Sequence, residues 1–422
     1  MDKRMHVNVR SEIGELEGVI LHTPGSEVEN MTPKNAERSL YSDILNLAVA
    51  NREYAQLAGV LEKVTNTFQV KDLLSDILAN DKIKESLLEK ICRFEHRPEI
   101  RDHLLSLSPD EGARQLIQGV IEVKDTLTKY LSPERYALRP LHNFFFTRDA
   151  AMSVLDDVLV GRMANNVRER ESFIMEAIFD YHDMFKTRTV NPLNKKHLDP
   201  ATSIEGGDLL VARDDILLIG NGSRTTSQGI DFILEQLIHQ KEKERHIIVQ
   251  ELPHHPESFI HLDMVFTLLN RDECMVYEPL IFKRNKYQTI HIYIENGKVS
   301  KIEEEENILE ALRKLGMDLK PIYCGGRKDP WIQEREQWHS GANFFAVGPG
   351  KLIGYDRNVY TLEEMNNQGY EIIKARDVVK NRVDLAGHEK YVVALEGSEL
   401  PRGGGGARCM TMPFRRKPLE GS

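Results

Sequence analysis

The feature that most constrains the fold is a local pattern that occurs four times between residues 151 and 355. In each copy a short apolar strand leads through a polar turn of two or three residues into a second strand, which is typical of a β-hairpin. The turns are Asp156-Asp157, Arg213 to Asp215, Asn270 to Asp272 and Gly348 to Gly350. Helical periodicity and a further strand often follow, as at 230–238 and 246–252. Each unit is therefore interpreted as ββαβ.

Repeats of this kind predict how the whole chain is organised. Units of roughly 50 to 80 residues that cannot bury their own faces favour modules packed around a common axis. The N-terminal strand 18–22 and the helix that carries Leu47, Tyr54 and Leu57 could supply a fifth module. We therefore predict an α/β fold, a propeller of five ββαβ modules. The alternative is an ordinary α+β fold whose hairpins merely look alike.

Residues 71–136 break the pattern, because they are almost purely helical in periodicity and highly charged. Ser108-Pro109-Asp110-Glu111 is a capping box with proline at the first helical position. We predict an inserted α-helical domain over 71–136 and a catalytic α/β domain made of 1–70 and 137–422. A second polar run, Glu303 to Asn307, is interpreted as a solvated face without chemistry.

Charge and hydropathy exclude several classes of protein. The net charge of −10 argues against a partner such as nucleic acid, whose phosphates require a basic surface. No apolar run reaches the roughly 18 residues needed to cross a membrane, and the start, Met1 to Arg4, is polar rather than signal-like. The four cysteines form no CxxC pair, so neither a disulfide framework nor a thiolate zinc cluster is expected. We expect a soluble, cytoplasmic protein.

The segment Arg402 to Pro413 is the most informative for chemistry. Four consecutive glycines, Gly403 to Gly406, lie shortly before Cys409 in the sequence. Such a run is tolerable where the backbone must turn sharply or approach a ligand closely, and it would present the thiol for nucleophilic attack. The alternative is a flexible C-terminal tail, but the Met-Thr-Met-Pro that follows does not resemble a linker.

A catalytic cysteine needs a histidine or a cation nearby, because a free thiol is mostly protonated at neutral pH. The candidate is His261, which an apparent strand over 259–264 would place on one face with Asp263. The competing interpretation is a metal site that also uses His254 and His255, although the spacing matches no recognised zinc motif.

Two further motifs carry carboxylates. Asp149 follows the aromatic run Phe144 to Phe146, and Glu205-Gly206-Gly207-Asp208 sets two acids around a glycine pair. A planar guanidinium would be well held by a pair of carboxylates and an aromatic wall. Asp149 and Asp263 suit that task, although each acid taken alone could cap a turn or pair with a core arginine.

The four motifs together resemble the bacterial arginine deiminases of the guanidine-modifying, or pentein, superfamily. They are Phe-Thr-Arg-Asp at 146–149, Glu-Gly-Gly-Asp at 205–208, His-Leu-Asp-Met at 261–264 and Arg-Cys-Met-Thr-Met-Pro at 408–413. The resemblance covers nearly the whole chain. It implies a five-module propeller, hydrolysis of L-arginine to L-citrulline and ammonia as the first step of arginine degradation, no cofactor, no metal and a homodimer.

The resemblance also implies a role for each matching residue. Cys409 would be the nucleophile, His261 the general acid and base, and Glu205 the residue that orients the histidine, while Asp149 and Asp263 would hold the guanidinium. The substrate-binding set would be Asn143, Phe146, Arg168, Arg224 and Gly403, with the two arginines on the substrate carboxylate. The alternative for Arg168 is a surface helix charge.

One position departs from the family pattern. Some relatives carry an arginine five residues before the cysteine, where this chain has Gly404; Arg402 or Arg408 could take its place. Competing functions are agmatine deiminase, dimethylarginine hydrolase, a metallohydrolase and a silent binding protein. The helical insertion argues against the first two, and the pair Arg168 and Arg224 against agmatine, which has no carboxylate.

Overall fold

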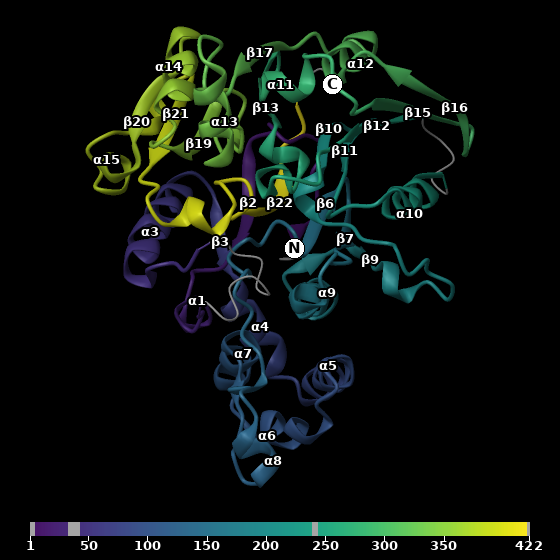
Figure 1. Cartoon of the computed structure of the whole chain (residues 1–422), viewed down its shortest axis with the longest axis vertical. Coiled ribbons are helices and arrows are strands. Elements are labelled where there is room, and N and C mark those ends of the chain that lie inside the picture. The colour runs from purple at the N-terminus through teal and green to yellow at the C-terminus, as the bar shows by residue number, and fades with distance from the viewer. Residues whose placement is uncertain (1–4, 33–42, 239–243, 420–422) are drawn as a thin grey trace.

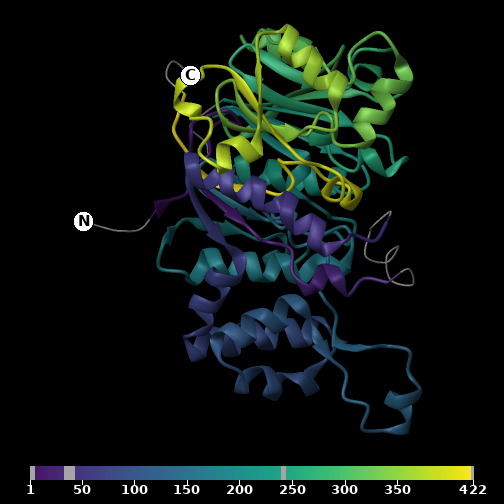
Figure 2. The same ribbon diagram turned by 90° about the vertical axis from the view of Figure 1, so that its left-hand side faces the viewer.

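The computed structural model describes residues 5–32, 43–238 and 244–419 (Figures 1 and 2). The polar start at 1–4 lies outside these ranges. The chain forms a mixed α/β structure in which several small sheets, rather than one large one, carry the strands. In the part that the structure describes, no helix is both long and apolar enough to cross a bilayer.

Five of the sheets share one pairing scheme, in which the central strand is antiparallel to one neighbour and parallel to the other. The first three, in spatial order, are β22 (Met412–Arg416), β2 (Leu16–Leu21), β3 (Asn66–Gln69); β6 (Ala151–Val154), β7 (Asp157–Val160), β9 (Arg188–Val190); and β10 (Leu209–Arg213), β11 (Ile216–Asn221), β12 (Arg245–Glu251). The last two are β13 (Phe266–Asn270), β14 (Glu273–Val276), β17 (Lys320–Tyr323); and β18 (Phe345–Gly348), β19 (Lys351–Tyr355), β21 (Tyr391–Leu395).

Three further strands extend two of these sheets, and two small sheets stand apart. β15 (Thr289–Glu295) and β16 (Lys298–Glu305) continue the third sheet beyond β12, and β20 (Glu371–Lys374) lies at the edge of the fifth. The small sheets pair β1 (Met5–His6) with β8 (Phe185–Lys186), and β4 (Val120–Ile121) with β5 (Tyr136–Leu138). The described residues form no closed sheet, so the propeller stays a prediction.

Helices connect the strands within the units. They are α1 (Ser26–Glu29), α3 (Leu47–Val64), α9 (Glu169–Tyr181), α10 (Ser227–Ile238), α11 (Glu278–Ile281), α12 (Ile308–Lys314), α13 (Pro330–Trp338), α14 (Val359–Asn367) and α15 (Ala375–Val379). The predicted N-terminal strand and helix correspond to β2 and α3, and the helix predicted at 230–238 is α10. All four predicted hairpins are confirmed, because each polar turn joins two antiparallel strands.

The strand predicted over 259–264 is wrong. Two 3₁₀ turns, η6 (Glu257–Phe259) and η7 (Leu262–Met264), flank an extended His261. The cause is tertiary, since the Leu262 amide donates to Asp208 Oδ1 at 2.9 Å rather than to a neighbouring strand. The third hairpin accordingly begins at Phe266.

The segment predicted to be an inserted domain contains α4 (Val70–Leu78), α5 (Asp81–Phe94), α6 (Arg101–Ser106), α7 (Pro109–Gln118) and α8 (Leu127–Leu131). Figure 1 shows these helices projecting below the sheets. The capping box at Ser108 and Glu111 is confirmed. The apolar faces of α4 and α5 join one core with α9, so the helices are anchored to the second sheet. The boundaries 71 and 136 stay a prediction.

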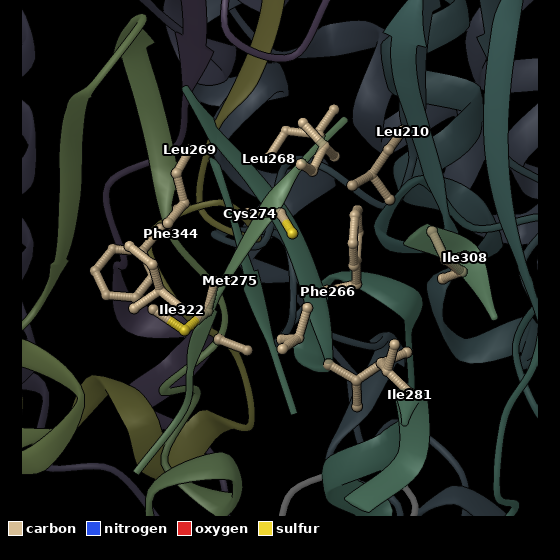
Figure 3. Packing of buried hydrophobic residues seen from close by; sticks show 14 of the residues in the cluster. Leu210, Phe266, Leu268, Leu269, Cys274, Met275, Ile281, Ile308, Ile322 and Phe344 are labelled. Atoms are coloured by element: carbon tan, nitrogen blue, oxygen red, sulfur yellow. The ribbon is translucent and has the colours of Figure 1, made fainter. Parts of the chain in front are cut away.

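The largest apolar core lies between the third, fourth and fifth sheets. Figure 3 shows Phe266 of β13, Cys274 and Met275 of β14, Ile308 of α12 and Phe344 in this core. Cys274 and Cys324 are part of this core, and burial raises the pKa of both thiols, as for inert hydrophobes. The polar run from Glu303 is only partly solvated, because Glu305 and Asn307 are buried. The prediction of a wholly solvated face is therefore wrong.

Candidate active site

The predicted site residues converge on one small pocket although they are spread over 267 positions of the chain, from Asn143 to Cys409. The pocket is lined by Asn143, Phe146, Asp149, Arg168, Arg224, Ile260, His261, Gly403, Gly404, Gly405 and Cys409. Its volume is about 30 Å³, which leaves room for only a few water molecules. The two remaining predicted acids, Glu205 and Asp263, contact the pocket residues from behind.

Cys409 is 2% exposed and directs its sulfur toward a carboxylate. Its Sγ lies 3.7 Å from Asp263 Oδ2, and Asn343 Nδ2 donates to the same sulfur at 3.2 Å. Burial raises the pKa of the Cys409 thiol well above its usual value, and the negative charges of Asp263 and Asp149 raise it further. The unliganded site therefore holds a protonated thiol.

Asn343 contacts Cys409 and Asp263, and it was not predicted from the sequence. Its Oδ1 accepts hydrogen bonds from the backbone amides of Arg408, at 2.9 Å, and Cys409, at 3.2 Å. Its Nδ2 also donates to the backbone oxygen of Asp263 at 3.2 Å. One buried amide thus fixes the nucleophile and the carboxylate beside it. No local motif marks Asn343, because its partners lie 80 and 65 or 66 residues away.

Arg408 supports Asp263 rather than the loop. Its Nη1 donates to Asp263 Oδ2 at 2.8 Å, and Nε and Nη2 form a bidentate pair with Glu12 at 3.1 and 3.0 Å. Since Arg408 is 1% exposed, it cannot replace the loop arginine of some relatives. Arg402 lies at the surface, where it pairs with Glu399 and Asp43. Neither arginine lines the pocket.

His261 faces two carboxylates from a fully buried position. Its Nε2 lies 3.0 Å from Glu205 Oε2, and its Nδ1 lies 3.8 Å from Asp149 Oδ1. Burial alone would lower the pKa of His261, but Asp149 and Glu205 outweigh it and raise the pKa to about 9. The imidazole is therefore protonated at neutral pH. Among the described residues, His261 Nδ1 and Asp149 Oδ1 have no hydrogen-bond partner, so both are available to a ligand.

Glu205 is the charged anchor of the histidine. Burial alone would raise the pKa of its carboxyl group, but Arg224, the bond to His261 and Arg168 lower it to about 2. Glu205 Oε1 also accepts from the Ala164 amide at 3.1 Å. A carboxylate fixed on both oxygens holds the imidazole ring in one orientation.

Arg168 is buried, so the surface-charge interpretation is wrong. Its Nη1 donates to Asp149 Oδ2 at 2.7 Å, and Nε and Nη2 contact both oxygens of Glu171 at 2.8 to 3.2 Å. One oxygen of Asp149 is therefore held by an internal guanidinium while the other faces His261. Arg224 lies 3.7 Å from Glu205 and is partly exposed. Both arginines line the pocket, as predicted.

The glycine run forms the outer wall of the pocket by passing close to Phe146. A Cβ atom built on Gly405 would lie 2.5 Å from the Phe146 ring, and one on Gly403 would lie 3.1 Å from it. Gly404 instead has open space and a φ of +88°. An arginine would be strained at that φ, so this loop adopts a shape that suits glycine.

The metal site considered in the sequence analysis does not form with its full set of ligands. His254 and His255 are exposed turn residues outside the pocket. Asp149, Glu205 and His261 do have ligand atoms within 4.8 Å of one another and could hold a cation. His261 is protonated and already binds Glu205 through Nε2, so its imidazole is not in the neutral form that binds a metal ion.

The pocket thus combines a buried thiol, an imidazolium, carboxylates and an aromatic wall, and comparison with solved structures places the fold of the chain. The structure is similar to an amidinotransferase of saxitoxin biosynthesis from Microseira wollei, with a TM-score of 0.54, 12% identity and 99% of each chain covered. It is also similar to the substrate-bound N-terminal domain of ArgZ, a cyanobacterial arginine dihydrolase, with a TM-score of 0.51, 13% identity and 95% and 99% coverage. The protein therefore has the pentein fold of guanidine-modifying enzymes.

Sequence comparison narrows this class to one family. The family model of arginine deiminase matches residues 38–416. The arginine deiminase of Listeria monocytogenes is 32% identical over 439 aligned residues that cover all of both chains, and that of Limosilactobacillus reuteri is 33% identical with 98% and 99% covered. The chain belongs to the arginine deiminase family.

Proposed function

We propose that this enzyme hydrolyses L-arginine to L-citrulline and ammonia with Cys409 as nucleophile. The observation that carries the proposal is the convergence of Cys409, His261 and Asp149 on one buried pocket, with Glu205 bound to His261 from behind and Asp263 3.7 Å from the sulfur. Family membership over most of the chain supports the same reaction.

The first half-reaction follows from the charges of the site. The guanidinium of arginine neutralises Asp149 and Asp263, which removes the main electrostatic cause of the raised Cys409 pKa, and the thiol releases its proton to solvent. The thiolate then adds to the guanidinium carbon. His261, protonated at neutral pH, donates a proton to one nitrogen, and the C–N bond breaks to release ammonia. A covalent S-alkylthiouronium remains on Cys409.

The second half-reaction uses the neutral His261 left by the first. It takes a proton from water, and the hydroxide adds to the thiouronium carbon. The C–S bond then breaks, the sulfur regains its proton from the product, and citrulline forms. Positioning and fixed charges carry the catalysis, because every reacting group is held by buried partners such as Asn343, Arg408 and Glu205.

We propose that Arg168 and Arg224 bind the substrate carboxylate, with Asn143 and Gly403 beside it and Phe146 against the guanidinium. This requires Arg168 to release Asp149, which it holds at 2.7 Å in the unliganded structure. Because the pocket is only about 30 Å³, the glycine loop must also move for arginine to enter. Substrate entry is therefore coupled to the exchange by Arg168 of Asp149 for the substrate carboxylate.

The proposal is tested by incubating the purified protein with arginine, agmatine or dimethylarginine and measuring citrulline and ammonia. We expect arginine to be turned over with a kcat/KM at least about a hundredfold higher than agmatine, since agmatine leaves the buried arginines unpaired. Chelators should have no effect, and alkylation of Cys409 should abolish turnover. Preference for agmatine or dimethylarginine would assign the chain another guanidine-modifying activity.

We also propose a propeller arrangement for the five sheets and an inserted domain for residues 71–136. The shared antiparallel-then-parallel pairing supports repeated modules, and closure through β22, which brings the C-terminal segment beside β2, supports a ring. The helices α4 to α8 lie between β3 and β5 in the chain and project from the sheets (Figure 1).

We propose a homodimer in the cytoplasm as the working state. All four cysteines are free, which fits a reducing compartment. The segment 120–133, called here the arm, exposes five large apolar side chains by more than 60% each: Ile121, Val123, Leu127, Tyr130 and Leu131. Contiguous exposed apolar surface of this kind is typical of an interaction site.

A further inference from the structure

A second cluster of titratable side chains lies outside the active site, on β12, β15 and β16. His291 is fully buried on β15, and the β15–β16 register sets Glu303 directly opposite to it. Glu305 lies two residues further on β16, on the same face of the sheet. His291, Glu303 and Glu305 each direct one ligand atom to a common point, with all three atoms within 4.8 Å of one another. We propose that these three side chains bind a divalent cation of the zinc class.

The spacing of the cluster is also compatible with two ligands on one ion. His291 Nδ1 and Glu305 Oε1 form a long hydrogen bond of 3.4 Å, beyond the most common range of about 2.7 to 3.2 Å for N–H···O bonds. Zinc binds nitrogen and oxygen at about 2.0 to 2.2 Å, so two ligands at a tetrahedral angle lie about 3.4 Å apart. One imidazole, two carboxylates and a water would complete such a site.

The outer partners of the cluster are those of a built metal site. His246 Nδ1 lies 3.1 Å from His291 Nε2, which leaves Nδ1 of His291 for the ion. Metal-bound histidines almost always have their second nitrogen held in this way. His291 also stacks on Tyr293 with ring centroids 3.8 Å apart, which fixes the plane of the imidazole.

The carboxylates are oriented in the same manner. Lys314 binds Oε2 of Glu305 at 2.5 Å, so Oε1 stays directed at His291. Tyr293 donates to Glu303 Oε1 at 2.7 Å, and Lys301 lies 2.6 Å from Oε2.

The place of the cluster in the fold suggests what a cation would do. β15 and β16 extend the third sheet beyond the modular three strands, and α12 packs against β12 and β16. Figure 1 shows this hairpin at the outer edge of the molecule. A cation shared by β15 and the end of β16 would hold the hairpin and the start of α12 together. Its role is structural, and the inference does not depend on the proposed reaction.

The test is metal binding by the untagged full chain after treatment with a chelator. We expect zinc to bind in calorimetry at this site with one ion per chain, cobalt to give the visible absorption bands of a tetrahedral complex, and zinc to raise the unfolding temperature. His291→Gln and Glu303→Gln should abolish the cobalt bands. His246→Asn, which changes only an outer partner, should weaken zinc binding by about 10- to 100-fold.

Two controls make the result specific. Glu304→Gln removes the same charge one residue away on the opposite, exposed face and should bind zinc as the unaltered chain does. Glu205→Gln probes the active-site cluster, which also has ligand spacing. Because the Glu303 side chain is 31% exposed, Glu303→Gln should fold even if His291→Gln does not. Lack of zinc binding, binding unchanged by Glu303→Gln, or loss only in Glu205→Gln would overturn the inference.

Discussion

At the scale of single residues, the site is organised by charge. Asp149 and Asp263 raise the pKa of the Cys409 thiol, and Asp149 and Glu205 raise that of His261 to about 9. In the proposed mechanism the same acids therefore keep the thiol protonated and the imidazole charged until a cationic substrate binds. A neutral ligand would leave the thiol protonated and unreactive. The charges of the site therefore favour a guanidinium as ligand, and its binding activates the thiol.

The raised pKa of His261 predicts the pH dependence of turnover. In the proposed mechanism the imidazolium protonates the departing ammonia, so kcat/KM, which reports the pKa values of the free enzyme, should fall as pH rises through about 9. Glu205→Gln removes one of the charges that raise this pKa, so the alkaline limb of the profile should move to lower pH. The profile of kcat/KM against pH for both proteins checks this. An alkaline limb that does not move would show that Glu205 does not set the charge of His261.

Asn343 should matter to catalysis as much as a residue that touches substrate. Asn343→Ala leaves the buried amides of Arg408 and Cys409 without their partner, at about 1 to 3 kcal/mol for each unsatisfied group. We expect kcat to fall at least about tenfold with KM little changed, because the sulfur is no longer positioned.

The matched control for this substitution is Asn358→Ala. Asn358 is equally buried and donates to His339 O at 3.0 Å, but it has no contact with Cys409. Urea unfolding and steady-state kinetics of both variants separate stability from catalysis. Equal kcat values in the two variants would mean that Asn343 is only structural.

At the scale of elements, the proposed mechanism requires the glycine loop, residues 403–406, to change conformation before substrate can enter the pocket. Gly404 has a φ of +88°, and a Cβ atom built on it would have no other atom within 4 Å. Gly404→Ala therefore adds no clash but costs about 1 kcal/mol of backbone strain. Gly369 has the same φ and the same free space, but it does not line the pocket. We expect equal losses of stability from the two alanine variants, and a lower kcat/KM only for Gly404→Ala. Thermal unfolding and kinetics check this, and an equal kcat/KM would remove the loop from the mechanism.

The strands and turns also show which parts of the fold could be predicted from the sequence. The hairpins were predictable because alternation and polar turns such as Asp156-Asp157 are local signals. The strand through His261 was not, because the bond from Leu262 to Asp208 links residues 54 positions apart. The sequence motifs predicted residues that line or contact one pocket, and their catalytic roles stay a prediction. No local sequence pattern marks Glu12, Glu171 or Asn343, which contact the site residues or their partners. Their roles could not be predicted because these contacts form only when the chain folds.

At the scale of the whole molecule, the arm predicts the assembly. Leu127→Asp with Leu131→Asp places charges on the exposed apolar surface and should weaken the homodimer at least about tenfold without unfolding the chain. Leu193→Asp, at a 39% exposed leucine elsewhere, is the control and should leave the dimer intact. Sedimentation over a range of concentrations measures both. A dimer unaffected by the arm variant would place the interface on another surface.

At the same scale, the site depends on contacts from segments near both ends of the described chain. Cys409 precedes β22, which pairs with β2 near the N-terminus, and Arg408 binds Glu12. The nucleophile is thus held by both ends of the chain, and Asp149 and His261 come from the sheets between them. Loss of the N-terminal strand would displace the thiol without touching any reacting residue.

The most direct test of the central claim is detection of the covalent intermediate on Cys409. Enzyme and arginine are mixed under single-turnover conditions and quenched in acid, and the peptide that contains Cys409 is examined by mass spectrometry. We predict an adduct with the mass of arginine less ammonia, which decays as citrulline appears and is absent in Cys409→Ala, a variant that still binds arginine but forms no citrulline. Citrulline formation by Cys409→Ala, or turnover with the adduct on another residue, would contradict the account.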